Sequence, residues 1–187
     1  MGGKRLSLFG DSLEVVFLCP NHECDELFIA YYEFRSWSGE YVLVDLRPRE
    51  IQNLAFSPSL QELSKEYCEI FEEAHKAEQL GLKKVCGVGY RKALEFLIKD
   101  YLIAQEPENR EAIESDPLGA CIERRVSDPR VKEIARRAVW LGNDETHYKR
   151  TWIDKDIDDL KSLIRLTVHW IEAELLTNET LQSMPRK

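Results

Sequence analysis

The first third of the chain carries the short apolar runs that are typical of β-strands. Three runs are rich in β-branched and aromatic residues, and turn residues such as Pro20-Asn21 and Ser38-Gly39 separate them. The pattern predicts a small antiparallel sheet of three strands that ends at Arg47-Pro48. The three predicted strands are Leu13–Leu18, Leu27–Phe34 and Tyr41–Leu46.

After about residue 57 the apolar positions recur every three or four residues, as they do along helices. Ser59 and Glu62 have capping-box spacing at the start of the first helix, and Gly81 is its expected end. Asp116 and Asp128 each precede a proline and are expected N-caps. The later helices are predicted over 83–104, 118–125 and 130–141, and from about 151–154 to about 176.

The helix over 83–104 is expected to bury one apolar face. Its predicted apolar stripe includes Val85, Val88 and Leu94. Gly87 and Gly89 are poor helix formers, so we expect them to allow a neighbouring helix to approach closely. The chain is therefore predicted to be mainly α-helical, with a β-rich part over 1–57, a helical bundle over 58–178 and a tail over 179–187.

Composition narrows the class of protein. The sequence is 43% hydrophobic, which suits a folded core, and no apolar run is long enough to cross a bilayer. No signal peptide is evident and the cysteine count of five is odd, so we expect a cytoplasmic protein with reduced thiols. The net charge of −8 argues against constitutive binding of nucleic acid.

A cysteine-containing turn follows the first predicted strand. Cys19, His22 and Cys24 resemble one knuckle of a zinc ribbon, but a structural zinc site needs four ligands and no second cysteine pair follows. We therefore predict no bound metal or cofactor, and we treat this loop as a degenerate zinc-ribbon turn. Zinc held by these three residues stays the alternative.

Two other patterns contain candidate site residues. Arg91 and Glu95 have the i,i+4 spacing of a helical ion pair, which either lies on the surface or borders the core and lines a site. In the segment from Arg136 to His147 an amphipathic helix is expected to end at Gly142-Asn143, with a histidine four residues after the asparagine. Asn143 and His147 are either a helix cap and a packed side chain or parts of a functional site.

These segments, taken in order, resemble a bacterial and phage family known as domain of unknown function 4145. The resemblance covers about 59–176 and depends on the motifs around Tyr90-Arg91, Leu118-Gly119 and Gly142 to His147. That family is similar to the HEPN superfamily of four- or five-helix bundles, which are commonly dimeric and occur in defence systems. The resemblance thus implies a HEPN-like helical bundle behind the small sheet.

Active HEPN ribonucleases carry an arginine, often followed by asparagine, and a histidine four to six residues after the arginine. Asn143 and His147 match this pattern, but Gly142 stands where the arginine belongs. Arginine would stabilise the negative charge that develops on phosphate, and glycine supplies none. Arg136 and Arg137 lie one to two helical turns upstream, so we expect weak ribonuclease activity or none.

Three hypotheses for function follow. The first is a non-catalytic helical module, in a defence, counter-defence or nucleic-acid-processing context, that dimerises or binds a protein partner. The second is a metal-independent ribonuclease that uses His147, Asn143 and a displaced arginine such as Arg137. The third is a binder of nucleotides or other small ligands. The second would be favoured if the basic residues of the central segment converge on His147; they are Arg124, Arg125, Arg130, Lys132, Arg136, Arg137, Lys149 and Arg150. The third would use a pocket lined by Arg91, Glu95, Asn143 and His147.

Overall fold

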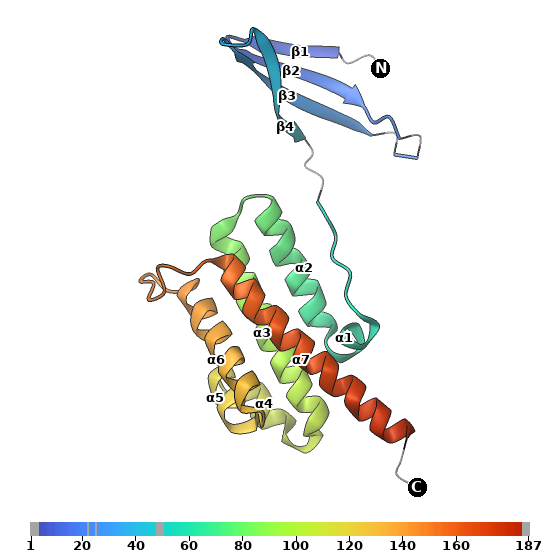
Figure 1. The fold of residues 1–187 in the computed structure, drawn as a ribbon, viewed down its shortest axis with the longest axis vertical. Coiled ribbons are helices and arrows are strands. Elements are labelled where there is room, and N and C mark those ends of the chain that lie inside the picture. The colour runs from blue at the N-terminus through green and yellow to red at the C-terminus, as the bar shows by residue number, and fades with distance from the viewer. Residues whose placement is uncertain (1–3, 22, 25, 48–50, 185–187) are drawn as a thin grey trace. The chain divides into compact units, whose positions relative to one another are not determined.

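A computed structural model describes residues 4–21, 23, 24, 26–47 and 51–184. The chain divides into two compact units, Met1–Gln52 and Asn53–Lys187, which are described separately (Figure 1). The division lies five residues before the expected one at 57. Within the described residues, none of the helices is both long and apolar enough to span a bilayer.

The first unit is a four-stranded antiparallel meander. Its strands are β1 (Lys4–Phe9), β2 (Ser12–Leu18), β3 (Leu27–Arg35) and β4 (Glu40–Arg47), in that order across the sheet. The register places Phe17 opposite Phe28, and their stacked rings lie 5.3 Å apart. The three predicted strands are present, and β1 precedes them as a fourth.

The second unit is a helical bundle, so the prediction of a mainly α-helical chain with a small N-terminal antiparallel sheet is confirmed. A single 3-10 turn at Pro107–Asn109 joins its third and fourth helices. The helices are α1 (Pro58–Leu63), α2 (Lys65–Gln79), α3 (Lys83–Gln105), α4 (Arg110–Ser115), α5 (Leu118–Arg125), α6 (Pro129–Asp144) and α7 (Ile157–Ser183).

Capping side chains place the helix starts differently from the prediction. Ser57, not Ser59, caps α1, and the buried Ser64 ends α1 and caps α2 by accepting a hydrogen bond from the Tyr67 amide. Asp128 caps α6 as predicted, through the amides of Arg130 and Val131. The N-cap position of α5 is occupied by Pro117, so the prediction that Asp116 caps this helix is wrong.

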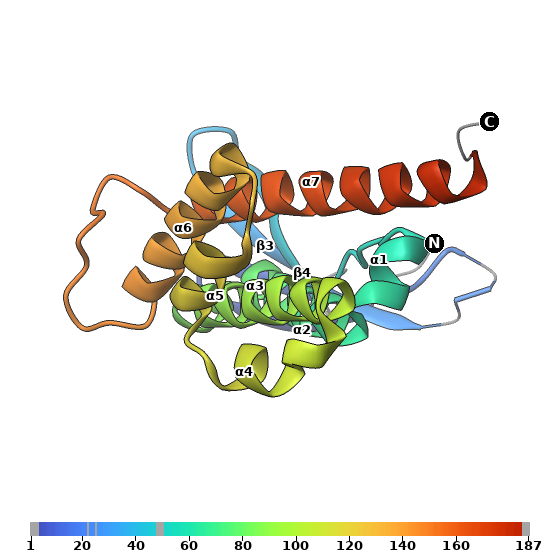
Figure 2. The ribbon, with the colours of Figure 1, turned by 90° about the horizontal axis from the view of Figure 1, so that it is seen from below.

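The last helix also differs in its bounds. It begins at Ile157 behind a capping box made by Asp156 and Asp159, and it continues to Ser183. Residues assigned to a tail after 178 are therefore helical through Ser183. The C-terminal part of α7 extends past the rest of the bundle in both views (Figures 1 and 2).

Helix α3 forms the centre of the core and contacts α2, α6 and α7. Tyr90 is fully buried, and its hydroxyl donates to Glu78 Oε2 at 2.6 Å, while Lys161 of α7 donates to Glu78 Oε1 at 2.7 Å. A Cβ on Gly89 would lie 2.8 Å from the Cβ of Ala74, so this glycine permits the predicted close approach of α2. Burial raises the pKa of Tyr90 and so keeps its hydroxyl a hydrogen-bond donor.

The first turn of α3 does not follow its predicted pattern. Val85 and Val88 are 60% and 41% exposed, although the apolar periodicity placed both in the core. Buried positions begin instead at Cys86 and Gly87, on the opposite side of the same turn. The apolar stripe of α3 is thus continuous only from Tyr90 onward.

Candidate functional site

Helices α3 and α6 meet at Arg91 and Gly142. A Cβ on Gly142 would lie 2.6 Å from the Cδ of Arg91 and 3.0 Å from its Cβ, closer than van der Waals contact allows. The aliphatic part of Arg91 therefore lies directly against the α6 backbone. This contact brings the Arg91 guanidinium beside Asn143, the residue that follows Gly142.

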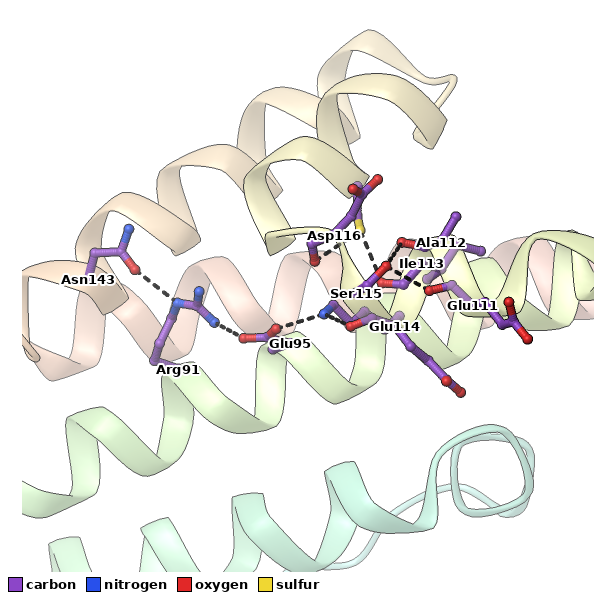
Figure 3. A network of polar contacts seen from close by, with 11 residues as sticks. Arg91, Glu95, Glu111, Ala112, Ile113, Glu114, Ser115, Asp116 and Asn143 are labelled. Atoms are coloured by element: carbon purple, nitrogen blue, oxygen red, sulfur yellow. Dashed lines mark hydrogen bonds and ion pairs between the residues drawn. The ribbon is translucent and has the colours of Figure 1, made fainter.

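The guanidinium of Arg91 is held from two sides (Figure 3). Its Nε donates to Asn143 Oδ1 at 3.1 Å, and Nη1 contacts Glu95 Oε2 at 3.0 Å. Glu95 Oε1 also contacts Lys99 Nζ at 3.0 Å, and Lys99 donates in turn to the backbone carbonyl of Glu114. The result is a polar chain that runs from α6 along α3 to α4.

Glu95 supplies the negative charge in this network of polar contacts. Burial alone raises the pKa of Glu95, but hydrogen bonds from Lys99 and Arg91 outweigh it, and the pKa lies below its ordinary value. Glu95 is therefore ionised at neutral pH and neutralises part of the charge on the two cations. The Arg91 side chain is only 16% exposed, so its charge is directed into the protein rather than toward solvent.

His147 lies outside this cluster. Its backbone amide donates to the carbonyl of Asn143 at 3.1 Å, but its side chain is exposed in the turn after α6. Among the described residues, none hydrogen-bonds to the imidazole. The structure thus brings together Arg91, Glu95 and Asn143 of the predicted ligand site, and it does not bring His147 into that group.

The expected helix end at Gly142-Asn143 is wrong. Helix α6 continues to Asp144, with Glu145 as its C-cap, and Gly142 is a buried position inside the helix. The reason is tertiary packing, because Gly142 is required for the contact with Arg91 and not for a left-handed turn. Asn143 accordingly bonds across to α3 instead of capping its own helix.

The two arginines upstream are engaged elsewhere. Arg136 forms ion pairs with Glu123 and Glu133, and Arg137 pairs with Glu133. Arg137 was predicted as a displaced catalytic arginine and Arg136 as a binding residue beside His147. Neither side chain has a described contact with the histidine. Their carboxylate partners also lower the local positive charge.

Most basic residues of the central segment do not converge on His147, although Lys149 and Arg150 follow it closely in the sequence. Arg130 lies in the first turn of α6 and Asn143 near its end, which separates them by about 20 Å at 1.5 Å per residue. Lys132 donates to the Glu123 carbonyl. Six of the eight form ion pairs with carboxylates; they are Arg124, Arg125, Arg130, Arg136, Arg137 and Arg150. The segment is therefore largely neutralised within the protein.

Asp144 is a site residue that the sequence patterns did not reveal. It is 7% exposed, and its Oδ2 accepts hydrogen bonds from the amides of Thr151 at 2.8 Å and Trp152 at 2.5 Å. A carboxylate is buried at a high cost unless donors satisfy it. These two amides supply donors, so Asp144 fixes the path of the loop between α6 and α7, which projects from the bundle in Figures 1 and 2.

The cysteine loop lies between β2 and β3. Cys19 donates its amide to the Glu26 carbonyl at 2.8 Å, and the Cys24 amide donates to Asn21. His22 lies outside the described residues. Within the described ranges, no three His, Cys, Asp or Glu side chains are grouped so as to hold a metal ion.

Comparisons with known proteins add no family to these observations. No protein-family model matches the chain. No curated protein and no solved structure matches it either. The resemblance to domain of unknown function 4145 and to HEPN bundles therefore stays a prediction from sequence motifs.

We predict that Gly142→Ala destabilises the protein although alanine favours helices. The added methyl group would push Arg91 away from Asn143, and overpacking of this kind costs about 1–3 kcal/mol, more than the ~1 kcal/mol gained in helix propensity. Urea unfolding should show a net loss of stability. An Arg91→Ala background removes the contacts with Cδ and Cγ and leaves only the contact with Cβ at 3.0 Å, so the same substitution should cost less there.

Gly119 provides the matched control for this comparison of Gly142→Ala in the two backgrounds. It is also helical, and a Cβ there would meet no atom within 4 Å. Gly119→Ala should therefore stabilise the protein by about 0.5 kcal/mol in either background. A Gly142→Ala variant that behaves like Gly119→Ala would contradict the tight contact with Arg91.

We also predict that Asp144→Ala loosens the loop between α6 and α7. Loss of the acceptor leaves the Thr151 and Trp152 amides unpaired, which should cost about 1–3 kcal/mol. Trypsin should then cut faster after Lys149 and Arg150. Asp144→Asn retains an acceptor oxygen and should lose less, and Asp154→Ala, at an exposed position of the same loop, serves as the control.

Proposed function

We propose that this chain is a non-catalytic helical interaction module that dimerises or binds a protein partner. The observation that carries the proposal is a row of exposed aliphatic side chains at the corner between α2 and α3. Its biological context, a bacterial or phage defence, counter-defence or nucleic-acid-processing system, is inferred from the family resemblance alone.

The apolar row is formed by Leu82, Val85 and Val88, which are 51%, 60% and 41% exposed. Their spacing of three residues places them along one side of the first turns of α3. Leu80, at the C-cap of α2, is 46% exposed and precedes the row. Contiguous exposed apolar surface of this kind is typical of protein–protein contact sites.

The pairing of the arginines considered for catalysis supports the non-catalytic part of the proposal. Phosphoryl chemistry of the HEPN type needs a guanidinium beside the reacting phosphate. Arg91 is bound to Glu95 and Asn143, and Arg136 and Arg137 are paired with glutamates. The Arg91 guanidinium is only 16% exposed and would have to give up Glu95 before it could bind a phosphate, and Arg136 and Arg137 have no described contact with His147.

One observation favours the second candidate, a ribonuclease with a displaced arginine. Arg91 lies against Gly142, the position where the motif has its arginine, and it already contacts Asn143. A second copy of the chain would then have to present His147 to the same phosphate. Glu95 opposes this function, since it neutralises the guanidinium that would be required.

We expect the native protein to self-associate, and Val85→Glu to shift it toward the monomer. A charge placed at a 60% exposed position weakens an apolar contact between chains without changing the core. Sedimentation over a range of concentrations measures the shift. Leu181→Glu, at a 66% exposed position of α7, is the control.

Two results would separate the forms of this proposal. A native protein that is monomeric but captures a partner, which Val85→Glu no longer captures, supports a partner-binding module. A monomer with no partner that depends on Val85 would contradict the proposal. Unfolding midpoints of both variants should match that of the native protein and so exclude misfolding.

We expect no cleavage of total RNA by the purified protein in the presence of a chelator. His147→Ala and Arg91→Ala are assayed beside it. Cleavage by the native protein that disappears in both variants would establish the ribonuclease and overturn the non-catalytic proposal. Glu95→Gln is informative too, because release of Arg91 should raise such an activity if it exists.

A further inference from the structure

Two tryptophans form an exposed aromatic pair where α6 and α7 are joined. Trp140 of α6 and Trp152 of the following loop lie with their ring planes within 8° of parallel and their centroids 6.3 Å apart. The residues are 42% and 43% exposed. Tryptophan is enriched at binding surfaces, where it offers a flat apolar face and an N–H donor.

The pair lines a cavity of about 290 Å³. Leu141 and Leu163 also contribute apolar side chains to its lining, and Ser162 contributes a hydroxyl group. Two cations, Arg137 and Lys155, complete the lining together with Asp159. The cavity thus combines flat aromatic surface with positive charge.

The position of Trp152 is built into the fold. Its backbone amide donates to the buried carboxylate of Asp144, and the neighbouring Thr151 amide donates to the same oxygen. Trp140 lies on the regular part of α6, more than two turns after the N-cap residue Asp128. The loop is therefore held in the arrangement that keeps the two indoles parallel.

Both cations are available at low cost. Arg137 pairs with Glu133 and is 49% exposed, and Lys155 contacts Asp159 at 3.1 Å and is 51% exposed. Exposed ion pairs of this kind contribute little to stability. An anion that enters the cavity can therefore exchange with these carboxylates without disturbing the fold.

We propose that the Trp140–Trp152 cavity binds a purine mononucleotide, with the base stacked on the indoles and the phosphate on Arg137 or Lys155. The site is distinct from the Arg91 cluster and from the apolar row of α3. The inference does not depend on the proposed interaction function, because it uses other residues and another kind of ligand.

The ring geometry favours a flat ligand. The two ring planes lie within 8° of parallel, so a planar base can stack on the exposed indole surface at about 3.4 Å. A quaternary ammonium group, the other ligand that aromatic pairs bind, is disfavoured by the two cations in the lining.

A free nucleotide is favoured over a nucleic-acid strand. The chain carries a net charge of −8, Asp159 lines the cavity, and Asp154 and Asp156 flank the lining residue Lys155 in the sequence. A long polyanion would be repelled by these carboxylates, whereas one phosphate needs only one of the two cations. We therefore expect a single nucleotide unit to be bound.

Adenosine monophosphate is the probe, and quenching of tryptophan fluorescence is the measurement. We expect saturable quenching that weakens about tenfold or more in Trp152→Ala and in Trp140→Ala, as removal of a base-stacking side chain usually does. Trp152→Phe keeps an aromatic face and should retain most of the binding. Trp37→Phe, at a position remote in sequence and 79% exposed, should bind like the native protein.

Further titrations test the phosphate and the source of the nucleotide. Adenosine should bind more weakly than the monophosphate, and Arg137→Gln with Lys155→Gln should abolish that difference. The assignment is overturned by an absence of saturable quenching in the native protein, or by equal affinities of the native protein and a folded Trp152→Ala variant. Tighter, strongly salt-dependent binding of an oligoadenylate would likewise overturn the mononucleotide assignment.

Discussion

The packing of α3 against α6 depends on the absence of a side chain at residue 142. A methyl group there would lie 2.6 Å from the Cδ of Arg91, so only glycine allows the arginine to lie along α6 and reach Asn143. Glycine at this position, where the resemblance to HEPN proteins would place an arginine, thus leaves the space that Arg91 occupies. An arginine at 142 and the present position of Arg91 are mutually exclusive.

The end of α6 extends this constraint to the surface. Because Gly142 and Asn143 are helical and bonded toward α3, the next residue, Asp144, is directed into the protein and must find donors there. It finds them in the loop that leads to α7. A buried carboxylate therefore sets the conformation of an exposed loop, and with it the orientation of Trp152. The contact of Arg91 with α6 and the Trp140–Trp152 pair are thus connected through the consecutive residues 142–144.

Local periodicity was sufficient for much of the fold. The β-branched and aromatic runs of β2, β3 and β4 and the apolar stripe of α3 each extend over many residues, so single exceptions do not hide them. The errors lie where one residue decides the outcome. Gly142-Asn143 has the composition of a helix end, yet a partner helix that the pattern does not contain makes it helix interior. Ser64 splits one predicted helix into two for a similar reason, because it caps α2.

The candidate site shows the same limit. Arg91 and Glu95 are neighbours by helical spacing, and their pairing needs no knowledge of the fold. The contact of Arg91 with Asn143 spans 52 residues, so helical spacing does not predict it. The apolar pattern of α3 does not show which side of the first turns of the helix faces solvent. Val85 and Val88 were therefore predicted to lie in the core. The apolar row belongs to the α2–α3 corner and the tryptophan pair to the α6–α7 junction, so each surface can change by mutation without altering the elements that build the other.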